Sequence, residues 1–176
     1  MGRVVHLSRP LVNMSSLPPL RVVSGGQTGV DRAALDAALA AGVAVGGWCP
    51  AGRWAEDGPI PRRYPLVEAA GADPAERTRL NVRDSDATLV LSPDPPAGGT
   101  ALTVRLARDL GRPLRVADPG RDSPGDVAGW VEALGRPLVL NVAGPRESEA
   151  PGIYRTARAW LSALLGVGAA DVRPTA

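Results

Sequence analysis

The residues best suited to binding chemistry lie in one short stretch, Ser24–Arg32, which reads SGGQTGVDR. An apolar run precedes it and an alanine-rich segment follows it, so the stretch connects a predicted strand to a predicted helix. Gly25, Gly26 and Gly29 allow backbone N–H groups to converge on a ligand without obstruction by side chains. A helix N-terminus adds a partial positive charge at the same place. The stretch therefore predicts an anion cradle of the kind that binds phosphate.

The spacing of these glycines does not identify the ligand. It matches neither the dinucleotide-binding pattern G-x-G-x-x-G nor the Walker loop, which requires a lysine. The chain contains no lysine, and all twenty of its basic residues are arginines. Arginine is suited to a two-pronged grip on phosphate or carboxylate, so several arginines could line a pocket.

Composition restricts the class of protein. With 176 residues, the chain is long enough for one domain with a substantial core. Its formal net charge is +2, without a run of like charges, so a nucleic-acid-binding stripe is not indicated. Cys49 is the single cysteine, and no apolar run approaches the roughly 20 residues that cross a bilayer. We expect a cytoplasmic protein without a membrane partner.

The single histidine, His6, limits the available mechanisms. It lies in residues 1–19, which we expect to be a disordered extension or sequence upstream of a start at Met14. A catalytic triad and a zinc site built on histidine are therefore disfavoured. Chemistry would have to use carboxylates, arginines, hydroxyls, amides or a bound cofactor.

The remaining pattern predicts an α/β fold. Five apolar runs alternate with helical segments, which predicts a single Rossmann-like three-layer αβα domain over residues 20–166, with a mainly parallel sheet of about five strands. Residues 167–176 are expected to form a tail. The expected strands are Leu20–Ser24, Val43–Gly47, Ala87–Leu91, Pro113–Ala117 and Pro137–Val142.

The expected topology brings several unusual loops together. Parallel strands place their carboxyl ends at one edge of a sheet, where ligands of such folds bind. A second glycine loop precedes a helix there, and a Pro/Gly-rich loop, Trp48–Pro61, follows the second strand. The predicted cleft is lined by Gly25, Gly26, Gln27, Trp48, Arg53, Gly98, Gly99, Thr100, Asn141 and Arg146.

Three features near this cleft allow two interpretations each. Asp31 could complete a capping box with Thr28 or contact a ligand. Trp48 and Trp54 could stack on a planar ring or cover an edge of the core. The helix that begins at Asp73 is unusually polar, so it lies on the surface or points polar groups such as Arg77 into a cleft.

Five segments resemble the molybdenum carrier protein family, and the resemblance spans roughly residues 20–166. The family is named for members similar to a protein that binds molybdenum cofactor, a pterin that bears a phosphate. The resemblance implies a Rossmann-like carrier that shelters this cofactor. The matching segments are Ser24–Arg32, Gly46–Pro61, Arg77–Asp86, Gly98–Thr100 and Asn141–Tyr154.

A wider resemblance concerns Glu76-Arg77, Asp86-Ala87 and the Gly-Gly-Thr loop. These segments are similar to the lysine-decarboxylase-like phosphoribohydrolases, which cleave nucleoside monophosphates. In that family an arginine equivalent to Arg77 and a glutamate three residues after the loop threonine carry the chemistry. Here the glutamate position is Thr103. The first glycine loop also resembles a DNA-processing protein that binds single strands, but the charge pattern argues against such a partner.

The leading hypothesis is a binding protein for a phosphorylated heterocycle, which the resemblance suggests is molybdenum cofactor (molybdopterin). The alternatives are a nucleotide or nucleotide-sugar hydrolase that uses Glu56, Asp57 or Glu147, and a nucleotide sensor without catalysis. Homo-oligomerisation stays open. The predicted cofactor-binding residues are Ser24, Gly25, Gly26, Gln27, Thr28, Gly29, Arg32, Trp48, Arg53, Arg77, Gly98, Gly99, Thr100, Asn141 and Arg146.

Overall fold

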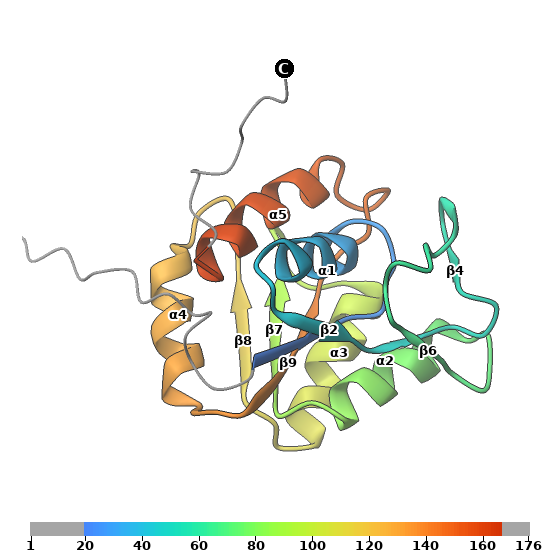
Figure 1. Ribbon diagram of the computed structural model, residues 1–176, viewed down its shortest axis with the longest axis horizontal. Coiled ribbons are helices and arrows are strands. Elements are labelled where there is room, and N and C mark those ends of the chain that lie inside the picture. The colour runs from blue at the N-terminus through green and yellow to red at the C-terminus, as the bar shows by residue number, and fades with distance from the viewer. Residues whose placement is uncertain (1–19, 167–176) are drawn as a thin grey trace, which may run out of the picture.

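The computed structural model describes residues 20–166, which contain a central sheet of five parallel strands, drawn in Figure 1. The expectations for residues 1–19 and 167–176 lie outside the described residues. All five strands coincide with predicted runs, because apolar segments bounded by Gly, Pro and Asp form buried strands. In spatial order they are β2 (Ala44–Gly46), β1 (Leu20–Val23), β9 (Leu138–Ala143), β7 (Ala87–Leu91) and β8 (Leu114–Ala117).

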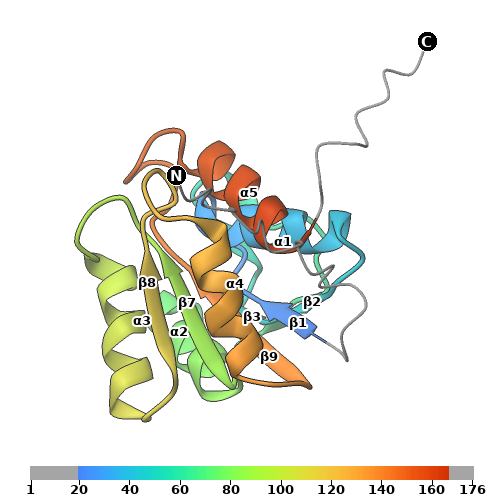
Figure 2. The same cartoon turned by 90° about the vertical axis from the view of Figure 1, so that its left-hand side faces the viewer.

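Helices cover both faces of this sheet, so the predicted three-layer α/β arrangement is confirmed. Figure 2 shows α2 (Pro74–Arg83) and α3 (Gly98–Asp109) on one side of the sheet and α1 (Val30–Ala40), α4 (Pro124–Ala133) and α5 (Ile153–Leu164) on the other. Within residues 20–166 no helix has the length and apolar character needed to span a bilayer.

Small residues determine how closely α1 approaches its neighbours. Ala33, Ala34, Ala37 and Ala38 are at most 1% exposed. They let α1 lie against both the sheet and α5, which are its main packing partners. This close packing holds the start of α1, and the glycine loop before it, against the segment that precedes α5.

The segment between β2 and α2 contains structure that the sequence did not predict. β3 (Trp48–Cys49) pairs in parallel with β6 (Val67–Glu68), and β4 (Trp54–Ala55) pairs in antiparallel fashion with β5 (Gly58–Pro59). We call residues 50–66 the flap. These strands are two residues long, too short for a periodic apolar pattern to reveal.

The last strand in the chain, β9, lies in the middle of the sheet. If the β9–α5 unit preceded β1, the order would be 3-2-1-4-5, which is that of a doubly wound dinucleotide-binding sheet. The point at which the order reverses then lies between β9 and β7. The loops that follow these two strands, residues 144–152 and 92–97, therefore border the expected ligand crevice.

Candidate functional site

The first glycine loop connects β1 to α1 and contacts the loop after β9. Gly29 is the N-cap of α1 and has a φ of 71°, a conformation that favours glycine. A Cβ at this position would lie 2.4 Å from the carbonyl oxygen of Pro145, so the close approach also requires glycine. The N–H of Val30 donates to the same oxygen at 3.2 Å. The structure thus brings these two loops together at one edge of the sheet.

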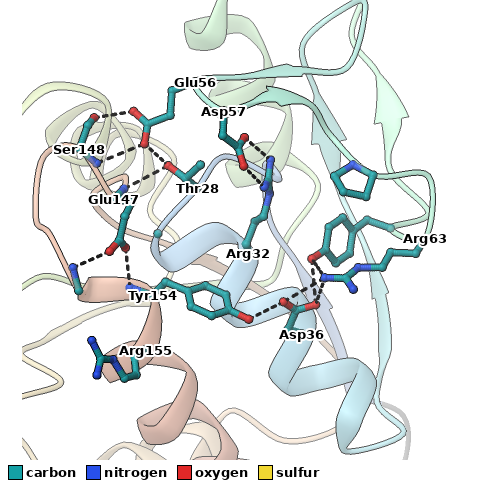
Figure 3. A pocket seen from close by; sticks show the side chains of 14 residues that line it. Thr28, Arg32, Asp36, Glu56, Asp57, Arg63, Glu147, Ser148, Tyr154 and Arg155 are labelled. Carbon is teal, nitrogen blue, oxygen red and sulfur yellow. Dashed lines mark hydrogen bonds and ion pairs between the residues drawn. The ribbon is translucent and has the colours of Figure 1, made fainter.

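The polar side chains of the glycine loop contact the flap (Figure 3). The Thr28 hydroxyl donates to Glu56, and the Glu56 N–H donates to the Gln27 side-chain oxygen at 2.9 Å. The Arg32 guanidinium donates to both carboxylate oxygens of Asp57, at 2.5 and 2.8 Å. Three residues predicted to bind a ligand therefore hold the flap in place.

These contacts favour the charged forms of the flap carboxyls. Desolvation is the largest single influence on Glu56 and raises its pKa, but hydrogen bonds from Ser148 and Thr28 together hold the pKa below its usual range. The hydrogen bonds from Arg32 hold the pKa of Asp57 below its usual range. Both groups are thus ionised, hydrogen-bonded carboxylates near neutral pH.

A small cavity lies between α2, the N-terminus of α3 and the ends of β1 and β9. We call it the Arg77 cavity, and its volume is about 30 Å³. It joins members of both glycine loops with two of the predicted arginines. Its lining residues are Gln27, Asp31, Arg77, Thr78, Gly99, Thr100, Thr103, Ala143, Gly144, Arg146 and Glu149.

Arg77 reaches this cavity from α2 and lies over the backbone of the glycine loop. A Cβ at Gly25 would be 1.9 Å from an Arg77 guanidinium nitrogen, so the absence of a side chain at Gly25 makes room for Arg77. The guanidinium donates to Asp31 at 3.1 Å. Arg77 Nε is buried and has no hydrogen-bond partner among the described residues. A buried donor of this kind is rare, and it points to a site with capacity for a further acceptor.

Asp31 is the buried counterion of Arg77 and does not form a capping box. Its carboxylate accepts from Arg77 and from the N–H of Gln27 at 3.3 Å, while α1 has no side-chain cap. Burial raises the pKa of Asp31, and the Arg77 guanidinium opposes this rise. The cap interpretation of Asp31 is therefore wrong.

The N-terminus of α3 contributes the second wall of the Arg77 cavity. α3 begins at Gly98, and no side chain caps it. Its first-turn N–H groups lack intrahelical acceptors, as in any helix, and carry partial positive charge. The Glu149 carboxylate lies beside this turn, 3.9 Å from where a Cβ of Gly98 would stand. Glu149 also pairs with the Arg146 guanidinium at 3.3 Å and accepts from its N–H at 3.2 Å.

Gly26 lies against the flap, where a Cβ at its position would be 2.6 Å from Leu66 Cδ1. Four further predicted site residues also lie outside the Arg77 cavity. Ser24 is fully buried and donates to the carbonyl oxygen of Val142 at 2.7 Å. Asn141 is buried within β9, where it faces Thr88. The Trp48 indole donates to Asp84 at 2.8 Å and borders a hollow on the α2 side of the sheet.

Arg53, the fourth of these residues, organises the flap. It has a φ of 52°, and its guanidinium donates to four flap carbonyl oxygens, those of Ile60, Pro61, Tyr64 and Leu66, at 3.0 to 3.3 Å. With these donors engaged within the chain, Arg53 acts as an internal brace.

A second, larger cavity lies between α1, the flap and the start of α5 (Figure 3). We call it the tyrosine cavity, and its volume is about 710 Å³. Of its walls, sequence reasoning placed Thr28, Gly29 and Arg32 in the cofactor-binding set, and named Glu56, Asp57 and Glu147 only for the alternative hydrolase. The residues it missed from the cofactor-binding set are Asp36, Glu56, Asp57, Pro61, Arg63, Tyr64, Glu147, Ser148, Gly152, Tyr154 and Arg155. A helical signal existed for Asp36, which is four residues after Arg32 and thus on the same face of α1.

The described residues contain no group of three or more His, Cys, Asp or Glu side chains that could hold a metal ion. Cys49 is buried, and desolvation raises the pKa of its thiol. It is therefore not poised as a thiolate ligand. The donors of the Arg77 cavity are guanidinium and N–H groups, which suit an anion.

Two comparisons with known proteins agree with the geometry. The chain is similar to a solved structure described as "Putative molybdenum carrier protein" from Syntrophus aciditrophicus SB, with 40% identity and a TM-score of 0.78. The match covers 86% of this chain and 98% of that chain. No curated protein gives a significant match. The model of the circularly permutated YpsA SLOG family matches residues 22–165, which agrees with the displaced position of β9, and the chain therefore belongs to this family.

Proposed function

We propose that this protein binds and carries a phosphate-bearing heterocycle, molybdenum cofactor, with the phosphate in the Arg77 cavity. The name of the similar protein from Syntrophus aciditrophicus supports the cargo, and the donor set of the cavity supports the phosphate. Arg77, Arg146 and the N–H groups at the start of α3 would hold the phosphate oxygens. The pterin would supply the dithiolene that holds the metal, so no protein metal ligand is required.

The unpartnered Nε of Arg77 is the observation that best supports this site. An arginine whose Nε lies buried beside a helix N-terminus loses hydrogen bonds to water without regaining them in the protein. A phosphate oxygen in the cavity would restore that bond. Asp31 neutralises part of the guanidinium charge, so a ligand and Asp31 would share Arg77.

Glu149 determines whether a phosphate can enter. The cavity holds about one water molecule in volume, and the Glu149 carboxylate lies at its mouth against Arg146 and the start of α3. The Glu149 carboxylate is itself an anion, so it competes with phosphate for the same anion-binding groups. Because the Arg146–Glu149 pair is more than a third exposed on both sides, its separation costs little.

The proposed site is tested by calorimetric titration with inorganic phosphate. We expect Arg146→Gln to weaken binding by about tenfold, because a charge-assisted hydrogen bond is lost. Glu149→Gln should tighten binding, because the competing carboxylate loses its charge. Arg79→Gln, an exposed change on α2, is the matched control and should leave the affinity unchanged. Equal affinities in all four proteins would contradict the site.

The cargo is tested separately. Free molybdenum cofactor should retain its ability to activate a cofactor-free molybdenum enzyme for longer when this protein is present. Arg146→Gln should shorten that lifetime towards the value without protein. A lifetime that the wild-type protein does not extend would exclude the carrier function, whatever the phosphate result.

A second candidate function is favoured by the position of Glu149. Phosphoribohydrolase chemistry needs a carboxylate near an oxocarbenium-like centre, and Thr103 cannot supply one. Glu149 borders the same cavity as Arg77, although it comes from another loop. In this case water would replace the base at C1′ of a nucleoside monophosphate and release ribose 5-phosphate. Glu149→Gln would then abolish turnover while preserving phosphate binding, which separates the two candidates.

A further inference from the structure

We propose that the tyrosine cavity is a second ligand site, separate from the phosphate site, for a planar ring that bears one negatively charged group. This cavity and the Arg77 cavity share no lining residue. The hydrogen bond from the N–H of Glu147 to Thr28, at 3.1 Å, closes the wall of the tyrosine cavity next to the glycine loop. Its volume of about 710 Å³ lies within the range of about 300–1,000 Å³ that is typical of small-molecule sites.

The side of the cavity next to α1 is built around Asp36. The two tyrosines of the chain, Tyr64 and Tyr154, both donate their hydroxyls to this carboxylate, at 2.9 and 2.8 Å. Arg63 donates to it at 3.0 Å. Both tyrosine hydroxyls are thus held in place by one partly buried acceptor, and the ring of Tyr154 stands in the wall as a fixed flat surface (Figure 3).

The carboxylates in the wall are all satisfied within the protein. Asp57 is paired with Arg32, and Asp36 with Arg63. Glu147 accepts from the N–H groups of Gly152 and Tyr154 at the start of α5, at 2.5 and 3.0 Å. The positive end of that helix dipole offsets its charge.

Glu56 completes this set of carboxylates. It accepts from the Thr28 hydroxyl and from the Ser148 N–H and hydroxyl, the last two at 3.2 and 2.5 Å. It lies near the N-terminus of α1, where Gly29 is the cap. Because each of these carboxylates already has partners within the protein, the cavity does not need a cationic ligand to neutralise them.

Arg155 is the charged side chain of the tyrosine cavity that has no partner of opposite charge among the described residues. It is exposed at the rim, adjacent in sequence to Tyr154, and no acceptor among the described residues bonds to it (Figure 3). Tyr154 and Arg155 line the same cavity, so this guanidinium is the charge available at its rim to an anionic substituent of a bound ring. Arg155 also borders a neighbouring hollow of about 700 Å³, whereas Tyr154 does not, so variants of Tyr154 report on the tyrosine cavity alone.

Three matched probes test the proposal by calorimetric titration: 2-naphthoate, 2-naphthylmethanol and 2-naphthylmethylammonium. They share a planar bicycle and differ in charge. We expect naphthoate to bind about tenfold more tightly than the alcohol, from one charge-assisted hydrogen bond to Arg155. Arg155→Ala should remove that difference, and the exposed control Arg105→Ala on α3 should preserve it.

Variants of Tyr154 separate the ring from its hydroxyl. Tyr154→Phe should retain naphthoate binding within about threefold, whereas Tyr154→Leu should weaken it by about tenfold, because stacking area is lost. Arg146→Gln should change phosphate binding without changing naphthoate binding. The proposal is overturned if naphthoate does not saturate the protein, if the ammonium probe binds more tightly than naphthoate, or if binding is insensitive to both Arg155→Ala and Tyr154→Leu.

Discussion

Arg77 and Asp31 form the ion pair that connects α2 to the first turn of α1. Their side chains are 16% and 4% exposed, and the guanidinium lies over Gly25. Burial of both groups means that either charge alone would be poorly solvated. The pair therefore positions a binding group and also constrains the folded state.

We predict that Arg77→Met lowers the free energy of unfolding by about 3–5 kcal/mol, because it leaves the Asp31 carboxylate buried without its counterion. The double variant Asp31→Asn with Arg77→Met should recover a substantial part of this loss. Urea unfolding followed by tryptophan fluorescence measures both. Arg79→Met, an exposed change on the same helix, should alter stability by no more than about 0.5 kcal/mol. If Arg77→Met changes the free energy of unfolding as little as Arg79→Met does, the Arg77–Asp31 ion pair does not contribute to stability.

At the scale of elements, the flap is held to the glycine loop by two carboxylates and organised internally by Arg53. Glu56 contacts Thr28 and Ser148, and Asp57 contacts Arg32. The first glycine loop and the loop after β9 are therefore both attached to the flap, in addition to their direct contact with each other. Docking of the flap closes one side of the tyrosine cavity.

Docking of the flap should weaken in acid. The folded pKa values of Glu56 and Asp57 lie below their ordinary values of 4.5 and 3.8. Their contribution to stability is thus complete above those ordinary values and is lost as the pH falls through the lower folded values. We expect hydrogen exchange of residues 54–59, corrected for the intrinsic pH dependence, to become several-fold faster at pH 3 than at pH 6.

The double variant Glu56→Gln with Asp57→Asn checks the cause of this change. It should exchange rapidly at both pH values, because neutral side chains make weaker hydrogen bonds to Thr28, Ser148 and Arg32. Asp109→Asn, an exposed change on α3, should behave as the wild type. If the hydrogen exchange of the wild-type flap does not change with pH, the ionised Glu56 and Asp57 side chains do not hold the flap in place.

At the scale of the whole molecule, the position of β9 explains the placement of both candidate sites. β9 lies between β1 and β7, so the loop that follows it reaches the glycine loop on one side and the start of α3 on the other. Arg146 and Glu149 of this loop border the Arg77 cavity, while Glu147 and Ser148 border the tyrosine cavity. A single loop thus separates the two sites.

A permuted chain tests whether this architecture depends on chain order. The variant begins at exposed Gly135, between α4 and β9, and joins residue 176 to residue 1. Because all five strands and their neighbours are preserved, we expect the same far-ultraviolet circular dichroism and a Tm within about 5 °C of the wild type. Phosphate affinity should also be retained. A permuted chain that does not fold would show that the natural order of the strands is required.

The sequence alone determined the five strands, the helices between them and the edge at which the loops meet, because apolar periodicity and Gly, Pro and Asp signals act over a few residues. It also placed Arg146 and Gly98–Thr100 at that edge, because parallel topology brings strand ends together, whereas Arg77 entered the predicted site from the polarity of its helix and from the family resemblance. Only the tertiary structure decided which side chains meet. Arg53 braces the flap, Thr28 and Arg32 contact Glu56 and Asp57, and Asp36 gathers both tyrosines. These partners are 7 to 118 residues apart in the chain, so no local pattern could specify them.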